Sequence, residues 1–130
     1  MAQYYVFSFC NGLYVDSPVA NDEVVAFKYS QSGVINKMYL ICVNEAVACD
    51  SQQIKLDVGI SGDDDTFISD YEPADNSLEG TILDITSALL TTVYTAGTEI
   101  VLSVSQAGTD GSTAMGQFSL VVELKVATTT

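Results

Sequence analysis

Apolar and polar residues alternate with a period of two through most of this chain, which is the pattern of β-strands whose two sides meet different surroundings. Residues 53–60 give the clearest example, with Ile54, Leu56 and Val58 on one side and Lys55 and Asp57 on the other. We expect the first side to face a core and the second to face water. Further strands are predicted at residues 3–9, 23–29, 35–43, 66–69, 81–85, 99–105 and 116–126.

The number and spacing of these strands indicate the fold class. About eight short strands, with turns every 8–12 residues or so and almost no helical periodicity, are typical of an all-β antiparallel two-sheet β-sandwich, which we expect to be jelly-roll-like. Residues 61–65 are predicted to form a turn and residues 70–80 an acidic loop, and residues 86–94 a turn followed by a short strand. The two strands at 99–105 and 116–126 are predicted to pair as a hairpin.

The predicted strand at residues 35–43 is apolar on both sides. Strict alternation places Ile35 and Tyr39 on one side and Met38 and Leu40 on the other. A strand of this kind is either central and covered on both sides or part of a subunit contact.

The chain of 130 residues has the size of one domain, so we expect a single β-sandwich over residues 1–130. Aromatic residues concentrate in the first quarter, and residues 1–34 are therefore a candidate oligomerisation or attachment segment. The residues predicted to make interface contacts are Tyr4, Tyr5, Phe7 and Phe9, with the loop at 106–115 as a weaker candidate. Residues 127–130 are predicted to be a frayed tail.

Charge and missing residue types exclude several classes of function. The chain has 17 Asp and Glu against 4 Lys and no Arg, and its formal net charge is -13. Nucleic acids and anionic membranes are therefore poor partners, because both attract cations. Histidine is absent, which removes the commonest general base and zinc ligand, and no glycine-rich phosphate-binding motif occurs. We expect no enzymatic activity and no cofactor.

The cysteines and the apolar segments give little evidence of export. Cys10, Cys42 and Cys49 are odd in number and form no CxxC pair, so buried or incidental thiols are expected, and a bridge between Cys42 and Cys49 stays open as an alternative. The first residues do not have the pattern of a secretory signal, and the longest apolar run is too short to span a bilayer. We expect synthesis in a cytoplasm.

The segment from Asp57 to Glu79 is rich in carboxylates and contains no lysine. Oxygen ligands of this kind can bind calcium, and the candidate ligands are Asp63, Asp64, Asp65 and Asp70, although their spacing does not fit an EF-hand loop. A solvated acidic loop is the simpler interpretation. Glycoside hydrolysis by two carboxylates is disfavoured, since Trp, His and Arg are all absent.

Three segments together resemble a known group of proteins. They are KMYLICV at 37–43, IKLDVGI running into SGDDDTFI at 54–68, and YTAGTEIVL at 94–102. Over residues 35–126 the chain resembles the small jelly-roll structural proteins of tailed bacteriophage virions, in which a "DVG…GDxDxF" turn precedes an extended loop. Gly59, Asp63 and Phe67 match this turn, and the aromatic amino-terminal segment has no counterpart in the pattern.

The resemblance implies a capsid decoration or cement protein on the surface of the virion, made in the host cytoplasm. Such proteins oligomerise, often as homotrimers, and bind neighbouring subunits of the major capsid protein. An acidic surface without arginine would keep a particle coated with many copies soluble. The alternatives are a receptor- or glycan-binding module of the tail or baseplate and a calcium-stabilised accessory domain.

Overall fold

The computed structural model of the chain describes residues 2–8, 13–16, 23–47, 54–73, 78–106 and 115–127. Within these residues it contains ten β-strands and one short 3-10 helix. In chain order they are β1 (Ala2–Ser8), β2 (Leu13–Asp16), β3 (Glu23–Lys28), β4 (Gly33–Val47), β5 (Lys55–Ile60), β6 (Asp63–Tyr71), β7 (Ile82–Asp84), η1 (Thr86–Ala88), β8 (Val93–Tyr94), β9 (Glu99–Gln106) and β10 (Met115–Ala127). None of these segments forms a helix that is long and apolar enough to cross a membrane.

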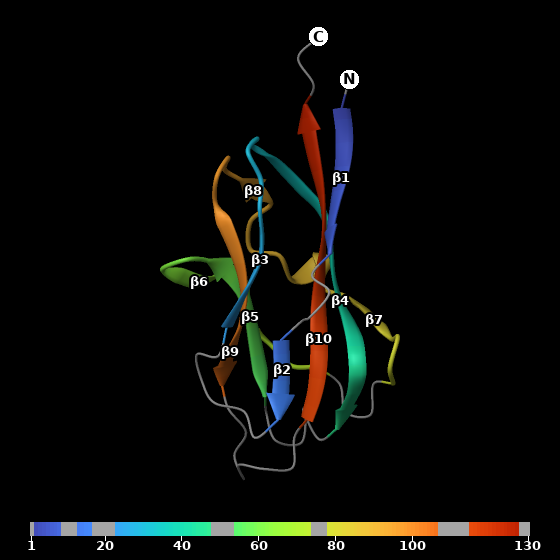
Figure 1. Cartoon of the computed structure of the whole chain (residues 1–130). Coiled ribbons are helices and arrows are strands. Elements are labelled where there is room, and N and C mark those ends of the chain that lie inside the picture. The colour runs from blue at the N-terminus through green and yellow to red at the C-terminus, as the bar shows by residue number, and fades with distance from the viewer. Residues whose placement is uncertain are drawn as a thin grey trace.

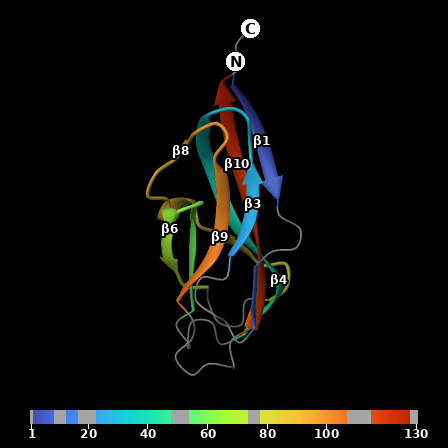
Figure 2. The ribbon, with the colours of Figure 1, turned by 60° about the vertical axis from the view of Figure 1, so that its left-hand side comes forward.

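The strands form two antiparallel sheets that lie face to face (Figure 1). The order in the larger sheet is β1-β10-β4-β7, with β2 also beside β10 and β8 also beside β4. The order in the smaller sheet is β3-β9-β5-β6. The turned view shows the two layers, with β3, β9 and β6 in one and β1, β10 and β4 in the other (Figure 2). The predicted all-β two-sheet sandwich is confirmed.

Eight of the strands pair in a nested order, the first with the last. β1 pairs with β10, β3 with β9, β4 with β7, and β5 with β6. This is the pairing of one long antiparallel ribbon rolled up into two sheets, which is a jelly roll. The predicted jelly-roll arrangement of about eight strands is therefore confirmed, and the short strands β2 and β8 are additions to it.

The predicted hairpin between the last two long strands is wrong. β9 pairs with β3 and β5 in the smaller sheet, whereas β10 pairs with β1, β2 and β4 in the larger one. The chain thus passes from one sheet to the other between these strands. Alternation locates both strands but cannot distinguish a hairpin from such a crossing, because in either case the apolar side of each strand faces the same core.

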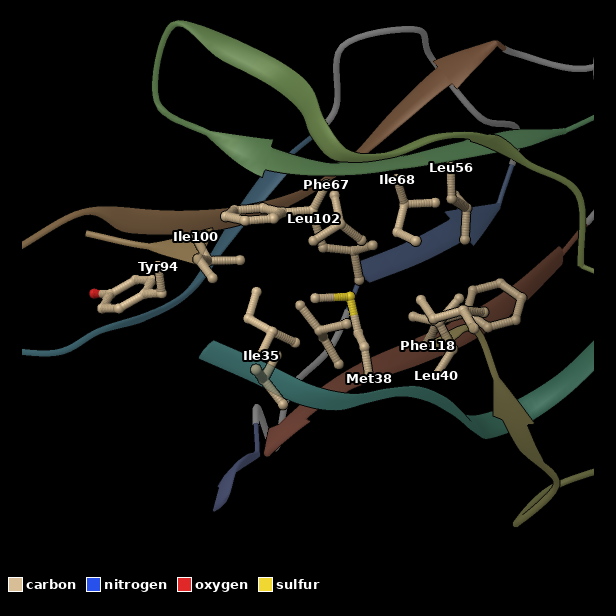
Figure 3. Close-up of a cluster of buried hydrophobic side chains, with 14 of the residues drawn as sticks. Ile35, Met38, Leu40, Leu56, Phe67, Ile68, Tyr94, Ile100, Leu102 and Phe118 are labelled. Atoms are coloured by element: carbon tan, nitrogen blue, oxygen red, sulfur yellow. The ribbon is translucent and has the colours of Figure 1, made fainter. Parts of the chain in front are cut away.

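The core lies between the two sheets and is filled by alternate side chains of the central strands (Figure 3). Leu56 and Leu102 of the smaller sheet point toward Met38 and Phe118 of the larger sheet. The residues of the buried cluster are Ile35, Met38, Leu40, Cys42, Ile54, Leu56, Val58, Phe67, Ile68, Ile85, Tyr94, Ile100, Leu102, Val104, Phe118, Leu120, Val122, Leu124 and Val126. Burial of this apolar surface holds the two sheets together.

A β-bulge in β4 changes the side of the strand on which Ile35 lies. The register with β10 shifts between the pair Lys37–Glu123 and the pair Ile35–Leu124. The extra residue lets Ile35 and Met38 both point into the core, where neither is more than 1 % exposed. Strict alternation placed these two residues on opposite sides, which is wrong. The predicted central position of the strand is confirmed, since β4 lies between β10 and β7.

The outer side of the β5–β6 hairpin also differs from the prediction. Asp57 is only 5 % exposed, although alternation placed it in water, and its Oδ1 accepts a 2.8 Å hydrogen bond from the backbone N–H of Asp70. β6 contacts β9 as well as β5, so part of β6 covers the outer side of the smaller sheet. The predicted turn at 61–65 is shorter than expected, because only Ser61 and Gly62 form it and β6 begins at Asp63.

Gly59 allows the backbone of β6 to pass directly over β5. A Cβ atom at this position would overlap the carbonyl carbon of Asp64 and the carbonyl oxygen of Asp63. Both are backbone atoms, which cannot move aside as a flexible side chain could. The glycine of the DVG segment is thus required by a close approach between two strands.

Tyr94 connects two turns at one end of the core. Its side chain is fully buried, and its hydroxyl group accepts a 2.7 Å hydrogen bond from the N–H of Tyr29 and donates a 2.6 Å hydrogen bond to the carbonyl of Thr98. The carbonyl of Tyr29 also accepts a hydrogen bond from the N–H of Gly97. The connection after β3 is therefore held to the turn before β9.

We predict that Gly59→Ala lowers the free energy of unfolding by about 3 kcal/mol, because two backbone segments must move apart to admit the methyl group. Urea unfolding measures the change. Gly62→Ala is the control: its φ of 92° disfavours a side chain, but no atom lies within 4 Å of its Cβ position, so a smaller loss of about 1 kcal/mol is expected. An equal loss at both positions would contradict the close crossing.

We predict that Tyr94→Phe lowers the free energy of unfolding by about 1–3 kcal/mol, because the N–H of Tyr29 and the carbonyl of Thr98 lose their shared partner. Thermal and urea unfolding report the loss. Tyr39→Phe, at a half-buried position where the hydroxyl group makes no hydrogen bond to a described residue, should change stability by less than about 0.5 kcal/mol. Equal stability of the Tyr94→Phe variant and the wild type would show that the hydroxyl group is not structural.

Candidate interaction surface

The side of the larger sheet that points away from the core is apolar and exposed. We call it the outer face and define it by the alternate side chains of β1, β10, β4, β7 and β8 that point away from the smaller sheet. Its most exposed members are Tyr4 (51 %), Val6 (63 %), Val34 (48 %), Ile82 (62 %) and Val93 (65 %). Exposed large apolar side chains gathered on one side of a sheet are typical of an interaction site.

The register of the sheet makes these residues neighbours. Tyr4 lies opposite Lys125, Lys125 opposite Val34, and Val34 opposite Val93, so one row crosses four strands. The other rows consist of Val6, Glu123 and Lys37; of Val121, Tyr39 and Asp84; and of Ser119, Ile41 and Ile82. The outer face is therefore one surface built by β1, β10, β4, β7 and β8 of the larger sheet.

The charges on the outer face cancel one another. Lys37 and Lys125 contribute two positive charges, and Asp84 and Glu123 contribute two negative charges, whereas the whole chain carries -13. Counted over the side chains that the structure describes, the outer face is thus formally neutral on a strongly acidic protein. A second acidic surface can approach it with less repulsion than it would meet elsewhere.

Local contacts fix the charged side chains of the outer face. The amide of Asn36 donates a 2.7 Å hydrogen bond to the carboxylate of Glu123. The ammonium group of Lys125 lies 5.9 Å from the centre of the Tyr4 ring, a cation–π contact. These contacts leave the apolar side chains between them accessible.

Asp84 marks the β7 edge of the outer face. Its Oδ1 accepts a 3.0 Å hydrogen bond from the N–H of Thr86. Hydrogen bonds from the side chain and backbone of Thr86, with a smaller contribution from the charge of Lys37, lower the pKa of the Asp84 carboxyl group. Asp84 therefore stays ionised and balances a lysine on this surface.

The β5–β6 hairpin has the opposite character. Asp63 and Asp65 are exposed at the start of β6, and a hydrogen bond with the Asp63 side chain raises the pKa of Asp65, with burial and the charges of Asp63 and Asp64 as further causes. Lys55 lies 3.9 Å from the carboxylate of Glu72 in this region. The hairpin is thus an acidic projection of the smaller sheet.

The aromatic residues predicted to form an interface do not share one surface. Tyr4 lies on the outer face, where its side chain is exposed. Tyr5 and Phe7 alternate with it and are half-buried against the core. Phe9 lies outside the described residues, as does most of the loop at 106–115.

Tyr5 and Phe7 hold β1 across the sandwich to β3 and the residue that follows it. The ring of Tyr5 lies 5.1 Å from that of Tyr29, and the ring of Phe7 stacks on that of Phe27 at 4.5 Å. Both distances are typical of favourable aromatic pairs. These side chains fix the position of β1, so Tyr4 is the described member of the predicted set that is available for contact with another chain.

The sequence contained one sign of the outer face that the aromatic pattern missed. The apolar residues on both sides of the 35–43 segment were compatible with a subunit contact, and Tyr39 and Ile41 of that segment lie on the outer face. The short strands that contain Ile82 and Val93 were predicted, but their pairing with β4 was not. Only the pairing of strands distant in sequence shows that these residues form one surface.

The calcium candidates are placed along β6. Asp63, Asp64 and Asp65 begin the strand and Asp70 lies near its end, where its N–H is bonded to Asp57. In the part of the chain that the structure describes, no three acidic, cysteine or histidine side chains are grouped so that they could hold a metal ion. Calcium binding stays a prediction that this geometry does not strengthen.

The cysteine alternative is left open by the structure. Cys42 is fully buried on the core side of β4, as a small hydrophobic residue often is. Cys49 lies outside the described residues, so the bridge between the two stays a hypothesis.

We predict opposite pH dependences for two aspartate variants. The raised pKa of Asp65 means that its ionised form is disfavoured in the folded state, so Asp65→Asn should stabilise the protein at neutral pH. This gain should shrink as the pH falls through the raised pKa. The pKa of Asp84 is lowered, so Asp84→Asn should destabilise the protein at neutral pH. This loss of stability should shrink as the pH falls through the lowered pKa.

Urea unfolding midpoints of the wild type and both variants, measured from neutral pH to below the ordinary aspartate pKa of about 3.9, test this prediction. A change of the same sign for both variants would contradict the two assigned environments.

Comparisons with known proteins reveal a likeness of fold. No family model matches the sequence, and no curated protein matches it. Among solved structures, a chain of one titled "Cyanophage Pam1 capsid asymmetric unit" is similar, with a TM-score of 0.58 and 16 % sequence identity. The similarity covers 98 % of this chain and 84 % of that chain. At this identity the comparison shows a shared fold over almost the whole length of the protein.

Proposed function

We propose that the protein is a non-enzymatic structural component of a bacteriophage virion, which decorates and stabilises the capsid by binding itself and the major capsid protein. The observation that carries this proposal is the fold shared over 98 % of the chain with a chain of a cyanophage capsid asymmetric unit. The likeness extends through both sheets and is therefore not limited to a common sheet or hairpin.

The outer face is suited to this role. Its exposed side chains, such as Val6 and Ile82, would leave water when the larger sheet lies on a capsid surface. Stable protein interfaces bury about 1,600 Å² in total, so a contact across several strands is the appropriate scale. The work of the protein would be mechanical: each bound copy adds interface area that must be lost before capsid subunits separate.

The distribution of charge supports the same orientation. With the neutral outer face against the shell, the acidic β5–β6 hairpin of the smaller sheet, which carries Asp63, Asp64 and Asp65, would point away from it. Like charges on the exposed side of many copies would make particles repel one another. The same arrangement would leave the buried contact without an excess of negative charge.

Electron microscopy of purified particles tests the location. We predict density of this size and shape in many copies on the capsid surface, with the larger sheet toward the shell. Density at the tail or baseplate would instead support the receptor-binding alternative. Absence of the protein from purified particles would contradict a virion role altogether.

A binding experiment tests the surface. We predict that Ile82→Glu combined with Val93→Glu weakens binding to capsids that lack the protein by at least about tenfold, because unpaired carboxylates would be buried in the contact. Sedimentation with capsids measures the bound fraction. The matched control is Leu90→Glu, at a residue that is 67 % exposed and follows η1, outside the outer face. Equal effects of the two sets of substitutions would contradict the assigned surface.

A further inference from the structure

Within the described residues, β1 is an edge strand that pairs on one side only. It pairs with β10 along all seven of its residues, and no described residue pairs with its other side. Its sequence, AQYYVFS, contains no charged residue, no proline and no glycine. Such an edge presents a row of backbone donors and acceptors that can pair with another strand.

The other edge strands of the described chain carry features that oppose such pairing. β3 has Glu23 and Lys28 at its ends and a register shift in its middle. β6 carries four aspartates and two register shifts. β2, β7 and β8 have only four, three and two residues. Charges, bulges and short length are the usual means by which proteins protect sheet edges, and β1 has none of them.

The unpaired edge of β1 is held in place by the rest of the fold. Its register with β10 runs from Ala2–Ala127 to Ser8–Val121 without a shift. From the core side, Phe7 anchors it to Phe27 of β3, and Tyr5 anchors it to Tyr29, the residue that follows β3. A strand that is fixed in this way loses little conformational freedom when a partner strand binds.

We propose that two copies of this chain associate by antiparallel pairing of their β1 strands, with Tyr5 opposite the partner's Tyr5. The pairing is isologous, because both copies use the same edge. It joins the two larger sheets into one continuous sheet. The inference rests on the self-association included in the proposed function and names the surface through which it occurs.

Complementary side chains favour this register. With Tyr5 at the centre, Tyr4 lies opposite the partner's Val6, an aromatic and β-branched pair of the kind that stabilises antiparallel sheets. Behind Tyr4 stands Lys125, and behind the partner's Val6 stands the partner's Glu123. Lys125 and the partner's Glu123 thus stand in the same row, about 14 Å apart across three strand spacings.

The neighbouring registers lack this match. A centre at Tyr4 would place Lys125 in the same row as the partner's Lys125, and a centre at Val6 would place Glu123 in the same row as the partner's Glu123. If the centre of the pairing lay between two residues, each outer-face residue would lie opposite a core-side residue of the partner. The outer faces of the two copies would then point to opposite sides of the joined sheet. All three residue-centred registers join the outer faces into one surface, and among them the Tyr5-centred pairing alone avoids placing like charges at matching positions of one row.

Charge exchange at positions 4 and 6 tests the proposal. A Tyr4→Glu, Val6→Glu variant places two glutamates opposite two glutamates in a symmetric dimer, and a Tyr4→Lys, Val6→Lys variant does the same with lysines. We predict that each raises the dimer dissociation constant by at least about tenfold and that mixing the two restores a dimer with one copy of each. Sedimentation equilibrium over a concentration series measures the association, and circular dichroism checks the fold.

The matched control is Ile82→Glu, which should not change the dissociation constant. Ile82 lies on the far edge of the outer face and is 62 % exposed, against 63 % for Val6. Disulfide trapping is a second measurement. One variant carries Tyr4→Cys and the other carries Val6→Cys, and in both Cys10 and Cys49 are replaced by serine. A mixture of the two variants should form a disulfide-linked dimer, and either variant alone should form much less of it.

A wild-type chain that stays monomeric at all concentrations, an assembly of three copies, or equal weakening by Ile82→Glu would overturn the pairing. The experiment contains no capsid, so its failure is separate from failure of the proposed virion role. Conversely, the pairing can hold in solution even when binding to capsids fails.

Discussion

The position of β10 in the middle of the larger sheet is the constraint on which the rest of the structure depends. This strand of 13 residues pairs with β1 and β2 on one side and with β4 on the other. Its core-side residues, such as Leu120 and Val122, fill the space between the sheets, and the alternate residues, such as Val121 and Glu123, form the middle of the outer face. One strand therefore sets both the core and the candidate interaction surface.

The jelly roll separates two kinds of surface. Because its antiparallel ribbon is rolled up, the larger sheet collects strands from both ends of the chain, and with them the apolar residues Tyr4, Val34 and Ile82. The smaller sheet ends in β6, where the acidic residues cluster. A neutral apolar face on one layer and an acidic hairpin on the other is an arrangement that suits a protein lying on a larger assembly.

Sequence patterns predicted the strands well and their partners poorly. Alternation located β5, β9 and β10, because one side of each faces the core. It failed at Ile35, where a bulge adds a residue, and at Asp57, where β6 covers the outer side of the sheet. It also predicted a hairpin from β9 to β10, because a pattern of period two carries no information about which sheet a strand joins.

The candidate site was predictable only in part, for the same reason. Tyr4 was identified from the aromatic composition of the first strand, but Tyr5 and Phe7 belong to the inner side of that strand. Val34, Ile82 and Val93 come from separate segments and become neighbours only through the sheet register. A surface made from several strands has no local signature in the sequence.

The most direct test of the account is hydroxyl-radical footprinting of the free protein and of purified virions. Tyr39 lies on the outer face and Tyr71 on β6, and both are half-buried in the free chain. We predict that oxidation of Tyr39 falls strongly on the particle while oxidation of Tyr71 is unchanged. Protection of Tyr71 without protection of Tyr39 would contradict the claim that the outer face of the larger sheet binds the shell.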